Sequence, residues 1–186
     1  MQWIAILTML IDHFGIVWFP DSPVFRIVGR MAFPIYTFYV SVGMVRTANK
    51  KKYLARLGIL ALLSQIPFSL LFETRTINVI GTFFVSVAAV YAMERIPKHL
   101  PFRYLLPAAA ALGMEWIPFD YGAYGLALLL VYRYAPRHLW LILHSVLNVF
   151  YTVFLLGSSL QWFSLIPTAV LAHAAVPSWT GYSAPR

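Results

Sequence analysis

Asp12 and His13 are adjacent residues in an apolar stretch, residues 3–19, that contains no other charged side chain. A charged side chain in the middle of a membrane helix costs about 2.5–3.5 kcal/mol on insertion scales, so it normally faces a protein interior or a wet cavity. A neutral imidazole can remove a proton from an attacking amine or hydroxyl group. The pair therefore predicts either chemistry within a membrane or the handling of ions.

The two side chains cannot act as a simple face-to-face dyad. Neighbouring residues of a helix point about 100° apart, so Asp12 and His13 each need a separate partner. Asp12 shares a helix face with Thr8 and Gly15, and the glycine would let a second helix approach closely. A plainer alternative is that Asp12 pairs with a basic residue only to join two helices, with His13 as an incidental donor.

Arg30 is the predicted partner of Asp12, because a short connection places both in the outer half of the membrane. Pro34 would free the carbonyl of Arg30 and bend the helix where the guanidinium enters the membrane. An oriented arginine could instead stabilise a developing oxyanion, but we favour the ion pair. With Asp12 held by Arg30, His13 is left available as the general base.

The composition indicates which elements position these residues. The 186 residues are 61% hydrophobic and only 11% charged, with a mean hydropathy of +0.75, which predicts an all-α, polytopic membrane helical bundle. We expect one domain over residues 1–176, a short polar tail over 177–186, and no cleaved signal peptide. About eight transmembrane segments are expected, some of them short or kinked, near residues 2–19, 29–45, 53–72, 77–93, 103–117, 121–134, 139–156 and 160–176.

Basic residues gather in alternate connections, which predicts the orientation of the chain. Eleven of the 14 Lys and Arg residues fall on one side, and the positive-inside rule assigns that side to the cytoplasm, together with both termini. This segregation argues against a nucleic-acid partner. Part of the basic set could attract a phosphorylated cytosolic donor, or else only contact anionic lipid headgroups and fix the topology; its members are Lys50, Lys51, Lys52 and Arg56.

Uncharged polar residues recur within the apolar segments at helical spacing, and they are candidates for the wall of a substrate pocket. The alternative is that they only form hydrogen bonds between helices. Gln65 precedes Pro67 and suggests a broken helix that lines a site. At the outer face, Asp120 and Tyr121 could hold an amine, or form a turn in the aromatic belt. The remaining pocket candidates are Asn78, Thr82, His144 and Asn148.

Several stretches of the chain form an ordered set of motifs. They are TMLIDHFG at residues 8–15, GRMAFPIY at 29–36, KYLARL at 52–57, SQIPF at 64–68, Asn78 with Thr82, DYG at 120–122 and QWFSL at 161–165. Together they resemble the TraX family of membrane proteins, and the resemblance preserves their order and covers most of the chain to about Pro167.

The resemblance implies an acyl-CoA-dependent membrane N- or O-acetyltransferase, because the best-known TraX member acetylates the N-terminal amine of conjugative pilin from acetyl-CoA. It places Asp12 and His13 at the acyl-transfer site with Arg30 beside them. The implied location is the bacterial cytoplasmic membrane, in contact with membrane lipids. The implied acceptor is a protein N-terminus, or an exported small molecule or glycan.

Two other classes of function remain open at this stage. A proton-coupled membrane transporter could use Asp12 and His13 as a proton relay, although no inverted repeat is evident. A small scaffold protein would use its polar stripes only to join helices. The absence of cysteine excludes thiol chemistry. No metal is expected, since His13, His144 and His173 lie on three separate segments without a local ligand spacing.

Overall fold

The protein is all-α in the computed structural model, which describes residues 2–154 and 159–174. Each apolar segment predicted above contains a helix, and the expected tail lies outside the described residues. The helices are α1 (Gln2–Trp18), α2 (Pro23–Arg30), α3 (Ala32–Arg46), α4 (Lys50–Phe72), α5 (Val79–Arg95), α6 (Leu105–Trp116), α7 (Gly122–Tyr134), α8 (Trp140–Phe154) and α9 (Leu165–His173). Short 3₁₀ turns precede three of them: η1 (Pro101–Tyr104), η2 (Arg137–Leu139) and η3 (Ser159–Ser164).

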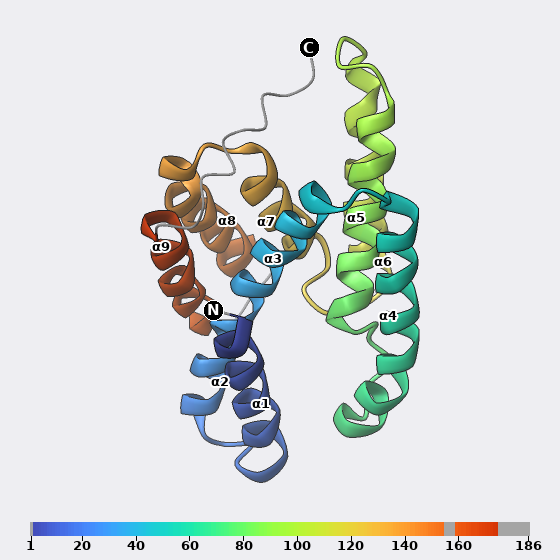
Figure 1. The fold of residues 1–186 in the computed structure, drawn as a ribbon. Coiled ribbons are helices and arrows are strands. Elements are labelled where there is room, and N and C mark those ends of the chain that lie inside the picture. Colours follow the sequence, from blue (N-terminus) through green and yellow to red (C-terminus); the bar gives the residue numbers. More distant parts are fainter. Residues whose placement is uncertain (1, 155–158, 175–186) are drawn as a thin grey trace.

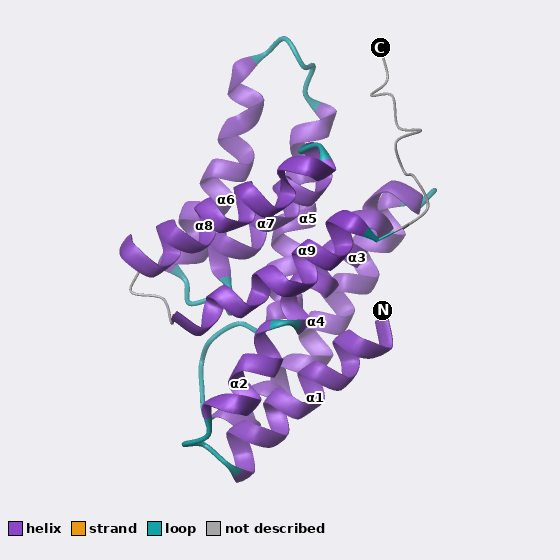
Figure 2. Ribbon diagram, turned by 90° about the vertical axis from the view of Figure 1, so that its left-hand side faces the viewer, coloured by secondary structure: helices purple, strands orange, loops and turns teal. Residues whose placement is uncertain are grey.

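Helix α3 runs through the middle of the molecule. Figure 1 shows α7, α8 and α9 on one side of it and α4, α5 and α6 on the other. Helices α1 and α2 form an antiparallel pair at one end, and α1 packs against α3. The view in Figure 2 shows that α5 and α6 form a hairpin that extends past the other helices. The site described below lies where the α1–α2 pair meets the end of α4.

The unit formed by α2 and α3 is bent. Its helix begins at Pro23, six residues before the predicted segment, and proline suits a first helical position because its missing N–H has no partner there. The helix is interrupted at Met31, three residues before Pro34. Pro34 cannot donate a hydrogen bond to the carbonyl of Arg30, so the predicted bend is confirmed.

Helix α4 continues through Pro67, which corrects the expectation of a broken helix there. A proline removes one N–H donor, and the helical bonds on either side of it hold the rest in register. None of the α4 residues is buried within the chain. Among the described residues, α4 and the bent unit Pro23–Arg46 are the two spans long and apolar enough to cross a membrane.

The core is centred on the contact between α3 and α7. Phe33 and Phe38 of α3 pack with Tyr124, Leu128 and Tyr132, which recur along one face of α7. A second buried cluster joins the end of α3 to α5, α6 and the opposite face of α7. Both buried clusters therefore include residues of α3 and α7.

Three of the basic connections meet at one end of the bundle. Lys50 at the start of α4 donates to Glu94 at 2.8 Å, and Arg133 near the end of α7 donates to the same carboxylate at 2.7 Å. Glu94 itself is close to the end of α5. The prediction that these connections share one side of the bundle is confirmed.

Candidate active site

Asp12 lies at a close approach between α1 and α2. Gly29 of α2 packs directly against the Asp12 carboxyl, and a β-carbon at residue 29 would overlap it. One turn further along α1, Gly15 packs in the same way against the side chain of Phe25. The close helix approach predicted at Gly15 is confirmed, and its consequence is that the Asp12 carboxyl is held between two helices.

The ion-pair partner of Asp12 is Arg26, and the prediction of Arg30 is wrong. Arg26 Nη1 lies 3.4 Å from Asp12 Oδ1. Arg30 follows one helical turn later, and its guanidinium donates instead to the hydroxyl of Tyr121 at 3.2 Å. Sequence reasoning missed Arg26 because residues 23–28 were treated as part of a connection. Pro23 after Ser22, and two arginines four residues apart, were the signals of a helix with a basic face.

His13 has one ring nitrogen occupied and one available. Its Nδ1 lies 2.7 Å from the carbonyl oxygen of Met9, and a carbonyl only accepts, so Nδ1 carries the proton of the neutral ring. The lone pair is then on Nε2. The ring also makes an edge contact with Phe72 at the end of α4, with 5.1 Å between ring centroids. In this tautomer Nε2 can accept a proton, as a general base must.

Asp120 is held near this site by its main chain. Ile77 and Phe119 form a parallel β-bridge, so the α4–α5 connection pairs with the α6–α7 connection. The amide of Asp120 donates to the carbonyl of Ile77 at 2.8 Å, and the carbonyl of Asp120 accepts from the buried hydroxyl of Thr82. Burial raises the pKa of the Asp120 carboxyl to about 6, although the Arg30 guanidinium acts in the opposite direction. A group with such a pKa can exchange protons near neutral pH.

Ionisable side chains from α1, α2 and the α6–α7 connection line one cavity of about 200 Å³ between the α1–α2 pair and the end of α4. A second cavity, of about 220 Å³, shares part of this lining and continues along α4 past Ser64 and Pro67. Polar groups with both charges therefore face a space large enough for a small substrate. The charged and titratable lining of the first cavity is Asp12, His13, Arg26, Arg30, Asp120 and Tyr121.

Tyr121 orients Arg30 toward this space. It has a left-handed backbone conformation, with φ of 64°, just before α7. Its ring stacks on Phe33 with 3.8 Å between centroids, and its hydroxyl accepts from Arg30. A positive φ at a residue that is not glycine is a strained conformation that packing must hold in place. The stacking on Phe33 provides that packing here.

Gln65, Asn78 and Thr82 mainly hold the framework of the site. The Asn78 carboxamide oxygen caps α5 by accepting from two backbone amides of its first turn, and its nitrogen donates to Ala61 in α4. The Gln65 oxygen accepts from both nitrogens of Asn78, and its amide donates to the carbonyl of Thr76. Of the three, Asn78 also borders the larger cavity. Their assignment to a substrate pocket stays a prediction.

His144 and Asn148 are fully buried in a packed hydrogen-bond network and lie outside the lining of the Asp12 cavities, and their assignment to a substrate pocket stays a prediction. Tyr124 Oη lies 2.6 Å from His144 Nε2 and donates to Asn148 Oδ1 at 2.8 Å. The sequence reasoning did not identify the partners of these two residues. The sequence signal for those partners was a second set of polar residues at helical spacing. The residues of that set, which complete the hydrogen-bond network, are Gln161, Ser164 and Thr168.

The predicted donor-binding residues lie at the far end of the bundle from Asp12. Lys51, Lys52 and Arg56 are exposed on the first turns of α4, and Lys50 is paired with Glu94. Their contact with a phosphorylated donor stays a prediction. No group of three or more His, Asp or Glu side chains in residues 2–154 and 159–174 is arranged to hold a metal ion, and the expectation of no metal also stays a prediction.

The fold and site define a class of all-α proteins in which ionisable side chains from several helices share one cavity. Within that class the chain belongs to the TraX family, whose model, described as TraX protein, matches residues 1–185. The match extends beyond Pro167, where the recognised sequence motifs ended. The family is associated with the N-acetylation of pilin.

An uncharacterized protein, RP591 of Rickettsia prowazekii (strain Madrid E), is similar to this chain, with 23% identity over 135 residues. The matched region is 70% of this chain and 52% of that protein, so the chain spans about half the length of the curated relative it matches. No solved structure matches the chain.

Proposed function

We propose that this protein is an integral membrane acyltransferase that transfers an acetyl or other short acyl group from acyl-CoA to an amine or hydroxyl of an exported or membrane-associated acceptor. The observation that carries the proposal is the state of His13. Its Nδ1 is used by the Met9 carbonyl, which leaves the Nε2 lone pair in a side chain that lines a cavity with Asp120 and Arg30. A base, a carboxylate and a guanidinium around one space suit acyl transfer to an amine.

In this mechanism the acceptor nitrogen attacks the carbonyl carbon of the thioester and forms the new C–N bond. His13 Nε2 takes the proton that the nitrogen loses. The C–S bond breaks, and the imidazolium returns the proton to the leaving sulfur, so that the products are an amide and a free thiol. The Asp120 carboxylate holds the amine through its N–H groups, and Arg30 faces the negative charge that develops on the carbonyl oxygen.

The distribution of apolar side chains supports placement in the bacterial cytoplasmic membrane as a multi-pass protein. Leu62, Leu63 and Leu70 of α4 expose 68–75% of their surface, and Trp116 at the end of α6 exposes 91%. Apolar surface on this scale is costly in water and needs an apolar solvent or a partner. We infer that lipid covers α4, and that the basic end near Lys50 faces the cytoplasm.

A comparison of two histidines tests the role of His13. His173 bonds its Nδ1 to the carbonyl four residues earlier at 2.8 Å, as His13 does at 2.7 Å, but it is exposed and away from the cavity. With purified protein, acetyl-CoA and an acceptor peptide, His13→Gln should reduce the transfer rate by about a hundredfold or more, and His173→Gln should leave it unchanged. Wild-type rates in His13→Gln would contradict the assigned role. Proton flux in proteoliposomes without any acyl-CoA dependence would favour the transporter instead.

A further inference from the structure

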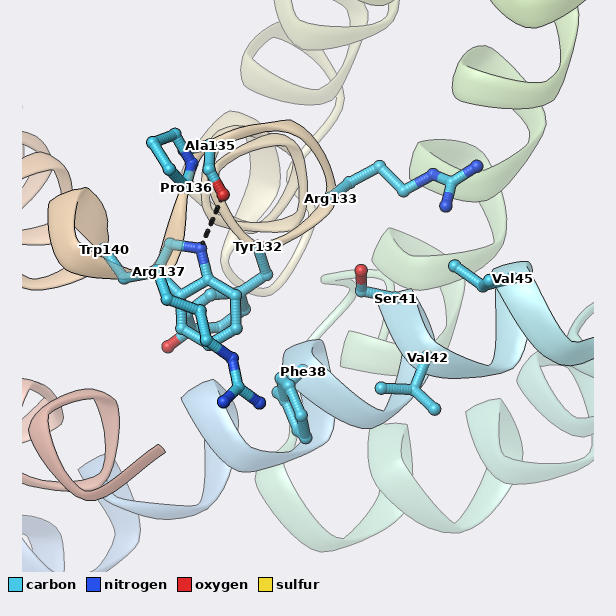
Figure 3. Close-up of a pocket in the computed structure, with 10 residues that line it drawn as sticks. All are labelled: Phe38, Ser41, Val42, Val45, Tyr132, Arg133, Ala135, Pro136, Arg137 and Trp140. Atoms are coloured by element: carbon cyan, nitrogen blue, oxygen red, sulfur yellow. Dashed lines mark hydrogen bonds between the residues drawn. The ribbon is translucent and has the colours of Figure 1, made fainter. Parts of the chain in front are cut away.

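A separate cavity of about 250 Å³ opens at the basic end of the molecule, between the end of α3 and the α7–α8 connection. Its floor is apolar and aromatic, with Phe38, Val42 and Val45 on α3 opposite Trp140. Figure 3 shows that Arg137 extends across the face of Trp140 toward Phe38. None of the residues identified above as catalytic or donor-binding lines this cavity.

Two arginines line this cavity. They are Arg133 and Arg137, and none of the described residues that line it is acidic. Glu94 accepts from both Arg133 and Lys50, so two cationic groups share this one carboxylate. Guanidinium groups bind phosphate oxygens through paired hydrogen bonds and also stack on flat rings. The cavity therefore suits a phosphate ester that carries a ring.

We propose that this cavity binds the adenosine bisphosphate part of acyl-CoA, an inference that rests on the proposed function. Ser41 lines this cavity and Ala32 lines the region next to Asp12, and their separation of nine residues along α3 corresponds to about 14 Å. The extended pantetheine arm of acyl-CoA covers such a distance. Phosphates at the basic end would then leave the thioester near His13.

The location of the cavity on the molecule favours a nucleotide over a lipid headgroup as the source of the phosphate. The cavity adjoins the basic connections that the positive-inside rule places in the cytoplasm, where acyl-CoA is found. Its aromatic wall is also fixed in place, because the indole nitrogen of Trp140 donates to the carbonyl of Ala135 at 3.0 Å. A ring held in this way, with the Arg137 guanidinium 5.6 Å from its centroid, can accept a planar base with little loss of conformational freedom.

The test is the binding of adenosine 3′,5′-bisphosphate, which has the phosphates and base but no thiol, to detergent-purified full-length protein by calorimetry. We expect wild-type binding, and Arg137→Gln should weaken it about tenfold or more, because a charge-assisted contact is lost. Val45→Trp, which fills the mouth of the cavity from an exposed position, should weaken it as well. Arg95→Gln is the matched control, since Arg95 is an exposed arginine at the same end that does not line the cavity.

Equal affinity of Arg137→Gln, Val45→Trp and the wild type, or no binding by the wild type, would overturn the proposal. The proposal would also be overturned if Arg137→Gln bound the bisphosphate like the wild type but lost binding to phosphatidylglycerol vesicles. That result would identify the ligand as a lipid headgroup. This binding test can be distinguished from a test of the proposed function. His13→Gln should bind the bisphosphate like the wild type even though it does not transfer acetyl groups. A wild-type protein that binds the bisphosphate but transfers nothing would refute the proposed function alone.

Discussion

Replacement of Asp120 by asparagine should stabilise the protein at neutral pH and remove its transfer activity. The pKa of this carboxyl is 3.8 when the group is exposed to water and about 6 in the folded protein, where burial disfavours the charged form. The folded state therefore binds the proton more tightly than the unfolded state. Stability from this group is present below about pH 4 and is lost as the pH rises through about 6.

The size of this loss follows from the two pKa values. At about 1.36 kcal/mol for each pH unit, the difference between 3.8 and about 6 corresponds to about 3 kcal/mol in favour of the unfolded state at pH 7.5. Asparagine stays neutral and avoids this cost. For a chain of this length about 3 kcal/mol corresponds to a rise of about 6–12 °C in the unfolding temperature. The rise should be absent near pH 4, where the wild-type carboxyl is also protonated.

The assay is thermal unfolding of detergent-purified protein from pH 4 to pH 8, beside the transfer rate over the same range. The wild-type rate should fall as the pH drops through about 6, because the carboxylate that holds the amine becomes protonated. Asp120→Asn should show little transfer at any pH. Asp21→Asn, at an exposed carboxyl between α1 and α2, is the matched control and should change neither property. An Asp120→Asn protein that melts no higher than the wild type at pH 7.5, or that transfers normally, would refute this reasoning.

Two further predictions concern the framework of the site. Gly29→Ala should destabilise the protein by about 1–3 kcal/mol in denaturant unfolding, because its β-carbon would overlap Asp12, whereas Gly113→Ala, with open space around it, should be neutral or stabilising. Equal effects of the two would contradict the close packing of α1 on α2. Asn78→Ala should cost at least about 2 kcal/mol, since it removes a helix cap and a bond to α4, and Asn49→Ala, which removes a single exposed cap bond, should cost about 1 kcal/mol. A smaller loss at Asn78 than at Asn49 would show that the α4–α5 junction is held by other contacts.

The helices were predictable because their signals are local. Runs of apolar residues located each segment, and Pro34 located the bend at Met31. Helix α2 was missed because it is only eight residues long and carries two arginines, Arg26 and Arg30, which make a short segment look like a loop to a hydropathy reading. With α2 missing, Arg26 had no predicted position, and Asp12 was assigned to Arg30.

The composition of the cavity was less predictable because it depends on contacts distant in sequence. Asp120 was identified as an outer-face residue, but its place beside Asp12 depends on the pairing of Ile77 with Phe119, which no local pattern signals. The stripe of His144 and Asn148 was predicted correctly as one helix face. What that face meets, Tyr124 and the η3 segment, is fixed only by the packing of α7, α8 and α9.

The β-bridge between Ile77 and Phe119 determines where this protein can tolerate changes in length. Successive residues of a paired extended segment point to opposite sides, so a shift of one residue exchanges the side chains that face each way. One residue inserted between Trp116 and Phe119 would have to bulge out or displace Asp120 from the cavity. The same insertion between Arg95 and Pro101, at the far end of the α5–α6 hairpin, would leave the cavity unchanged. Within the TraX family, insertions and deletions should therefore collect between the positions of Arg95 and Pro101 and avoid those between Trp116 and Phe119.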